Sequence, residues 1–175
     1  MILEDKLDRE KLDQVLAHLC GMIIDGQAND SNFYGMVAAA VIDPAGRTVA
    51  GVNYLYGVYR VHAERAAIDK YEQQYGDLPK GSTVVTTLSP CSGDSGDVRQ
   101  GDPCTDLLNE KHVKTAYCGY RDPTQHDQHN NFTIFITKNP KIKNLCQKFA
   151  ATFLKNKSNK NDIETRATRF VAEYQ

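Results

Sequence analysis

Four residues between positions 62 and 104 have side chains that could bind a metal ion and move protons: His62, Glu64, Cys91 and Cys104. An imidazole and two thiolates are typical zinc ligands, and a catalytic zinc ion leaves its fourth tetrahedral position to water. We therefore predict that His62, Cys91 and Cys104 bind Zn²⁺. Glu64, two residues from the imidazole, would transfer protons to and from a water molecule whose pKa the metal lowers to about 7.

Neither half of this set is a specific signal by itself. A His-x-Glu triplet at a helix start is common, and twelve residues separate Cys91 from Cys104. The order of the surrounding elements is more informative, because an expected hairpin and loop lead to His62 and an expected strand ends just before Cys91. Cys104 follows Pro103 and would begin a short helix, where exposed N–H dipoles favour a thiolate.

Apolar runs and turn signals predict the elements that hold these residues. A turn sequence, Asp43-Pro44-Ala45-Gly46, joins two apolar runs and is typical of a buried hairpin. The aromatic segment 54–59 is expected to be a loop that forms one wall of a pocket. The other expected elements are strands at 35–42, 48–52 and 83–88, a helix from 63 to about 75 that ends at Gly76, a surface loop at 92–102 and a short helix at 105–110.

Amphipathic patterns predict helices at both ends of the chain. The first is expected from about residue 5 to 24, with Gly26 ending it. A C-terminal helical extension, about 141–175, is expected to contain two more helices, at 142–154 and 163–174.

Two further strands are expected at 114–120 and 132–137. The linker 121–131 is short for a parallel crossover that carries a helix, so we predict that these strands pair antiparallel. The cysteines outside the candidate metal site are expected to be buried and unreactive. They are Cys20, Cys118 and Cys146.

The composition limits the classes of protein to which the chain could belong. Its 175 residues are expected to form one domain, 1–175. A net charge of −1, from 21 basic and 22 acidic residues, argues against an obligate nucleic-acid or membrane-surface binder and favours a small ligand. Five cysteines without a charged-then-apolar leader favour a reducing, cytoplasmic compartment, and no apolar run approaches the roughly 20 residues of a membrane-spanning helix.

The motifs His62-Ala63-Glu64, Pro90-Cys91 and Pro103-Cys104 together resemble those of the zinc-dependent cytidine/deoxycytidylate deaminase superfamily, over roughly residues 31–137. The resemblance implies a three-layer α/β/α fold with a five-stranded mixed sheet. It implies that His62, Cys91 and Cys104 bind zinc. It also implies that Glu64 is the catalytic proton donor in hydrolytic deamination of a cytosine-like or other aminopyrimidine nucleoside or nucleotide, with release of ammonia. Members are commonly dimers or tetramers, so a homo-oligomer is expected.

Two branches of this superfamily are similar to different parts of the chain. The long gap between the cysteines and the triplet Arg121-Asp122-Pro123 are similar to riboflavin-pathway pyrimidine deaminases, although the Pro-Asn-Pro substrate loop of those enzymes is missing. Ser31-Asn32-Phe33 and Gly51-Val52-Asn53 are similar instead to the ribose-side elements of free-nucleoside cytidine deaminases, but Leu55 replaces the glutamate expected after the second. The substrate therefore stays open.

The candidate substrate-binding residues are Asn32, Phe33, Asn53, Tyr54, Tyr56 and Ala63. Tyr54 and Tyr56 could stack on a flat base. Two alternatives to a small-molecule deaminase also stay open. One is a nucleic-acid base deaminase, which the near-neutral charge disfavours. The other is a non-catalytic member of the same fold that keeps zinc for structure and binds a partner through its surface helices.

Overall fold

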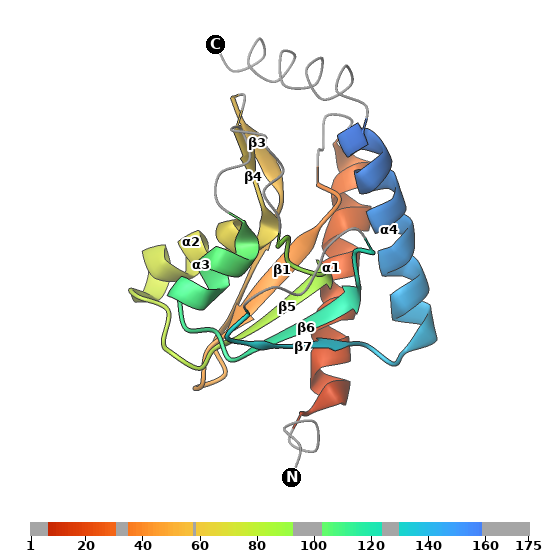
Figure 1. Cartoon of the computed structure of the whole chain (residues 1–175). Coiled ribbons are helices and arrows are strands. Elements are labelled where there is room, and N and C mark those ends of the chain that lie inside the picture. The colour runs from red at the N-terminus through yellow and green to blue at the C-terminus, as the bar shows by residue number, and fades with distance from the viewer. Residues whose placement is uncertain (1–6, 31–34, 58, 93–102, 124–129, 159–175) are drawn as a thin grey trace.

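The computed structural model describes residues 7–30, 35–57, 59–92, 103–123 and 130–158. Five strands in these ranges form one mixed sheet in the order β2-β1-β5-β6-β7 (Figure 1). β1 pairs antiparallel with β2 and β5, whereas β5, β6 and β7 run parallel. The bounds of these strands are Ala38–Ile42 for β1, Thr48–Val52 for β2, Thr83–Leu88 for β5, Thr115–Tyr120 for β6 and Thr133–Ile136 for β7.

Helices cover both faces of this sheet. α1 (Arg9–Asn29) and α4 (Pro140–Ser158) pack on one face, and α2 (Ala63–Tyr75) and α3 (Cys104–Glu110) lie on the other (Figure 1). Successive strand residues point to opposite faces, so each face has its own apolar core. The predicted three-layer α/β/α fold with a five-stranded mixed sheet is confirmed.

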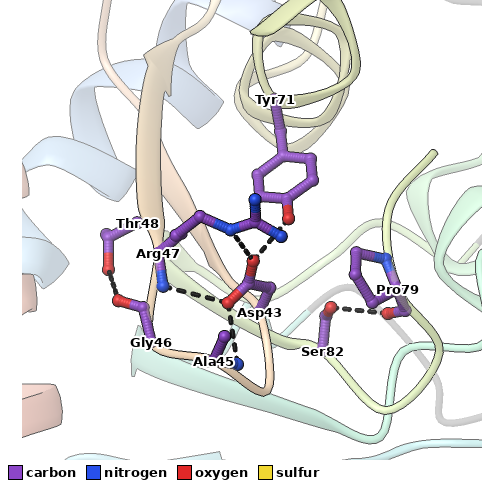
Figure 2. A network of polar contacts seen from close by, with 8 residues as sticks. All are labelled: Asp43, Ala45, Gly46, Arg47, Thr48, Tyr71, Pro79 and Ser82. Carbon is purple, nitrogen blue, oxygen red and sulfur yellow. Dashed lines mark hydrogen bonds and ion pairs between the residues drawn. The ribbon is translucent and has the colours of Figure 1, made fainter. Parts of the chain in front are cut away.

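The turn between β1 and β2 is fixed to α2 by the buried carboxylate of Asp43 (Figure 2). Oδ1 accepts hydrogen bonds from the N–H groups of Ala45 and Arg47, at 2.9 Å each. Oδ2 accepts from the Tyr71 hydroxyl and the Arg47 guanidinium, at 2.5 Å each. The Tyr71 hydrogen bond, assisted by Arg47, lowers the pKa of Asp43 to about 2. These hydrogen bonds fix the C-terminal half of α2 to the turn between β1 and β2. This turn lies at the opposite end of the strands from the carboxyl ends of β2 and β5.

Close packing positions the other half of α2. A Cβ atom at Gly51 in β2 would lie 2.6 Å from the Ala67 nitrogen and 2.9 Å from the Ala66 Cβ, which is closer than real Cβ contacts. Glycine on the strand and alanines on the helix therefore let the two backbones approach, and this contact holds the N-terminal half of α2 against β2.

Three predicted boundaries are corrected by the structure. α1 does not end at Gly26 but continues to Asn29. A glycine costs a helix only about 1 kcal/mol relative to alanine, and the Gly26 carbonyl accepts the capping hydrogen bond from the Asp30 N–H. α1 also begins at Arg9, where the Asp8 side chain caps it, and β1 begins at Ala38 instead of residue 35.

The aromatic segment before His62 is a hairpin, so the prediction of a loop was wrong. β3 (Tyr54–Tyr56) pairs antiparallel with β4 (Tyr59–Val61), with Tyr54 opposite Val61 and Tyr56 opposite Tyr59. Alternating tyrosine and leucine suits a strand, and Gly57 supplies the turn with a positive φ of 60°. The hairpin projects beyond the sheet near the start of α2 (Figure 1).

The antiparallel pairing predicted for the last two strands was also wrong, because β6 and β7 are parallel. A segment as long as 121–132 can span about 40 Å when extended, which exceeds the length of a strand such as β6 (Thr115–Tyr120), so its length does not exclude parallel pairing. In this orientation Ile134 and Ile136 pack against the core beneath α2 and α3.

The remaining expectations divide between described and undescribed parts of the chain. α4 confirms the helix expected at 142–154, and Cys20, Cys118 and Cys146 are buried as expected. The helix expected at 163–174 and most of the loop 92–102 lie outside the described residues. Among the helices that are described, none combines the length and the apolar character needed to cross a membrane.

Candidate metal centre and active site

The topology brings His62, Cys91 and Cys104 to one edge of the sheet. His62 is the N-cap of α2 and has an extended backbone, with φ −71° and ψ 155°. Cys91 follows the carboxyl end of β5, and Cys104 is the first residue of α3. Two helix starts and one strand end therefore present the three side chains from separate rigid elements.

The three donor atoms have a separation that fits a zinc ion. The ligand atoms of His62, Cys91 and Cys104 all lie within 4.8 Å of one another. Nδ1 of His62 is 3.1 Å from Sγ of Cys104 and 3.6 Å from Sγ of Cys91. Tetrahedral zinc with ordinary Zn–N and Zn–S bonds places such a nitrogen and sulfur about 3.6 Å apart. The donor types are those that zinc binds, and the separation of His62 from Cys91 matches this value, whereas Cys104 lies closer to His62.

The local electrostatics favour a thiolate at Cys91. The Cys104 N–H donates to Sγ of Cys91 at 3.2 Å, and the Thr105 N–H donates to the Cys91 carbonyl at 3.1 Å. Hydrogen bonding from the Cys104 thiol, followed by His62, lowers the pKa of Cys91 to about 4. The same hydrogen bond and burial raise the pKa of Cys104. A bound divalent cation would favour the thiolate form of both cysteines.

Glu64 lies beside these donors in the first turn of α2. Its carboxylate is 3% exposed, and Oε2 accepts a hydrogen bond from the Cys104 thiol at 3.4 Å. Burial raises the pKa of Glu64. A buried carboxyl group with a raised pKa, adjacent to a candidate metal site, is suited to holding and releasing a proton.

The candidate substrate-binding residues have different environments. Asn53 is buried at the end of β2, where its Oδ1 accepts from the N–H groups of Met36 and Val37 at 2.8 Å each. Its carboxamide oxygen is thus engaged by the backbone before β1. Ala63 is buried in a small apolar cluster. Asn32 and Phe33 lie outside the described residues.

Tyr54 and Tyr56 lie on the exposed face of the β3–β4 hairpin. Their side chains are 44% and 71% exposed. Tyr59 is directly opposite Tyr56, so three tyrosines share this face, while Leu55 on the other face is buried. The hairpin is followed at once by His62, which places the tyrosines on the segment leading into the candidate metal site.

Ser89 and Asp122 are two positioning residues to which the sequence reasoning gave no role. The Asp122 N–H donates to Oγ of Ser89 at 2.9 Å, and the Ser89 N–H donates to the Tyr120 carbonyl at 2.9 Å. Both residues are buried. They fasten the segment that carries Cys91 to the end of β6. The Arg121-Asp122-Pro123 triplet was the available signal, but its contact with Ser89 depends on the parallel pairing of β5 and β6.

These features define an α/β protein with a candidate catalytic metal site at the carboxyl edge of a mixed sheet. A family model described as the cytidine and deoxycytidylate deaminase zinc-binding region matches residues 11–120. The chain therefore belongs to this deaminase family, and His62, Glu64, Cys91 and Cys104 all lie within the match.

Solved structures show where the same fold occurs. The diaminohydroxyphosphoribosylaminopyrimidine deaminase/5-amino-6-(5-phosphoribosylamino)uracil reductase of Thermotoga maritima aligns with a TM-score of 0.64 and 24% identity, over 86% of this chain and 43% of that one. Acinetobacter baumannii RibD aligns with a TM-score of 0.61 and 18% identity, over 86% of this chain and 41% of that one. Guanine deaminase from Nitrosomonas europaea gives a TM-score of 0.52 and 17% identity, over 78% and 82%.

These likenesses show the fold and leave the substrate undetermined. The chain spans about two fifths of the length of the Thermotoga maritima and Acinetobacter baumannii proteins. No curated protein sequence matches the chain significantly.

Proposed function

We propose that this protein is a zinc-dependent hydrolase that removes the amino group of a cytosine-like or other aminopyrimidine nucleoside or nucleotide and releases ammonia. The observation that carries the proposal is the convergence of three zinc-type donor atoms within 4.8 Å, with the buried Glu64 carboxylate hydrogen-bonded to one of them. Membership of the deaminase family supports it. The neighbours named as deaminases act on different heterocycles, so the choice of an aminopyrimidine rests on the sequence resemblance.

In the proposed reaction, the zinc ligands and Glu64 have separate roles. His62, Cys91 and Cys104 would hold the zinc ion and keep one coordination position open. Zinc in such a site supplies Lewis-acid activation of water. Glu64 would accept the proton of the attacking water and deliver it to the ring nitrogen beside the attacked carbon. It would then take the remaining proton from the added hydroxyl group and deliver it to the amino group, which leaves as ammonia when the C–N bond breaks and the C=O bond forms.

A screen of ammonia release, together with metal analysis, tests this proposal. The purified protein is supplied with zinc and offered free bases, nucleosides, nucleotides and short oligonucleotides. We expect bound zinc and ammonia release from an aminopyrimidine nucleoside or nucleotide. Zinc without turnover on any compound would favour the non-catalytic module. Turnover confined to oligonucleotides, with a steep salt dependence, would favour a nucleic-acid deaminase.

The exposed tyrosines of the hairpin are the proposed stacking surface for the substrate. Tyr54 and Tyr56 lie on one face of a rigid two-stranded element that leads into His62. Stacking on a nucleobase needs only the ring face, so the hydroxyl group is dispensable for this role. The dimer or tetramer expected from the sequence stays a separate prediction.

We expect Tyr56→Ala to raise KM at least about 5-fold with little change in kcat, because base–aromatic stacking contributes about 1–3 kcal/mol. Tyr56→Phe should retain the parental KM. The matched control is Tyr75→Ala, which removes another exposed tyrosine at the far end of α2 from His62. Steady-state kinetics on the best substrate of the screen measure the effect. Equal KM values for Tyr56→Ala and the parent would show that Tyr56 does not contribute to substrate binding.

A further inference from the structure

Two buried thiols face each other in the helical layer opposite α2 and α3. Sγ of Cys20 in α1 lies 3.6 Å from Sγ of Cys146 in α4. The two side chains are 2% and 1% exposed. Both belong to the apolar core that α1 and α4 form on their face of the sheet (Figure 1). Neither residue belongs to the candidate metal centre, and the proposed deamination does not use them.

We propose that Cys20 and Cys146 form a thiol-oxidation site, in which hydrogen peroxide converts the two thiols into a disulfide that links α1 to α4 within the native fold. A disulfide requires a sulfur–sulfur distance of about 2.0 Å, so the two sulfurs have to approach by about 1.6 Å.

The packing around Cys146 explains why its thiol points toward Cys20. A Cβ atom at Gly119 would lie 2.2 Å from Sγ of Cys146, so the absence of a side chain at Gly119 gives the sulfur its place against β6. Cys118 is buried too, but it belongs to the core on the opposite face of the sheet. The sulfur that Cys146 contacts is therefore that of Cys20.

The hydrogen bond between the thiols assigns their roles in the reaction. The bond from Cys146 lowers the pKa of Cys20, against the effect of burial. The same bond, together with burial, raises the pKa of Cys146. Either sulfur can donate this hydrogen bond. With Cys146 as the donor, Cys20 is the sulfur that attacks the oxidant.

The two steps balance in atoms and electrons. The Cys20 sulfur attacks one oxygen of hydrogen peroxide, forming an S–O bond as the O–O bond breaks, and the released hydroxide takes up the Cys20 proton to leave as water. The Cys146 sulfur then attacks the Cys20 sulfur, forming the S–S bond as the S–O bond breaks. The second oxygen leaves as water with the Cys146 proton. Sulfur is oxidised and peroxide oxygen is reduced.

Peptide mapping of the oxidised full chain tests the proposal. The zinc-supplied protein is treated with hydrogen peroxide, alkylated under denaturing conditions and digested without reductant. We expect a peptide pair joining Cys20 to Cys146 that has lost two hydrogen atoms. The pair should be absent in Cys20→Ala and present in Cys118→Ala. Mapping also distinguishes it from any link between Cys91 and Cys104. Recovery of Cys20 and Cys146 as alkylated thiols, or as separate sulfinic acids, would overturn the proposal.

Thermal unfolding tests whether the native fold accommodates the bond. The oxidised parent should unfold at a Tm about 5 °C or more above that of the reduced parent, because the cross-link closes a long loop. Oxidised and reduced Cys20→Ala should share one Tm. A cross-linked protein whose Tm is unchanged or lowered would show that the bond forms only from an opened chain, contrary to the proposal.

Discussion

Replacing Glu64 with glutamine should lower kcat/KM by at least about 10²–10⁴-fold and leave the metal content unchanged. The carboxylate is the proposed proton carrier, and glutamine has the same shape but cannot carry a proton between the water and the leaving group. Glu64 is not one of the three grouped donors, so its replacement removes no proposed ligand. At this buried position, the amide oxygen of glutamine can still accept the hydrogen bond that the Cys104 thiol donates.

The same substitution elsewhere on α2 provides the control. Glu72 is half-buried and pairs with Lys111 at 2.6 Å, away from the candidate metal centre. Glu72→Gln should therefore keep the parental activity. Ammonia release measures the rate and elemental analysis measures zinc. If Glu64→Gln lost zinc together with activity, the carboxylate would be supporting the metal and not carrying protons. Full activity in Glu64→Gln would exclude both roles.

Cys104→Ala should weaken zinc binding by more than about 100-fold and abolish detectable deamination. Removing even an outer partner of a metal ligand commonly costs 10–100-fold in affinity, and Cys104 is a proposed direct ligand. The substitution also removes the thiol that donates a hydrogen bond to Glu64, so this carboxylate loses a partner. Competition with a chromogenic chelator measures the affinity.

Cys118→Ala is the matched control for this loss. It removes a buried cysteine from the middle of β6, beyond the candidate metal centre, and should keep zinc and activity. Circular dichroism of both variants shows whether the fold persists. If a folded Cys104→Ala protein kept the parental zinc affinity, Cys104 would not be a zinc ligand. That result would contradict the proposed site.

Local patterns were sufficient to predict most of the elements that hold the site. The helix after His62 and the strand before Cys91 follow from side-chain periodicity, because a helix repeats every 3.6 residues and a strand every two. The residue types at His62, Cys91 and Cys104 suggested zinc before any distance was known. In the structure, the ligand atoms of these three residues lie within 4.8 Å of one another.

The predictions that were wrong concern segments whose local sequence pattern is compatible with two different structures. The alternation in β7 is the same for parallel and antiparallel pairing, and a linker length excludes neither when the chain is extended. The hairpin of β3 and β4 was taken for a loop because each of its strands is too short to show a clear period. For Asn53, the similarity in sequence could not show that its oxygen binds the backbone before β1.

The sequence by itself determined the helix after His62, the strand before Cys91, the chemical types of the candidate ligands and the acid beside them. Only the tertiary structure decided the direction of β7, the contact between Ser89 and Asp122 and the meeting of Cys20 with Cys146. The physical reason is the separation along the chain over which each kind of interaction acts. Periodicity and capping act over a few residues, whereas these contacts join distant segments and form only when both faces of the sheet are packed.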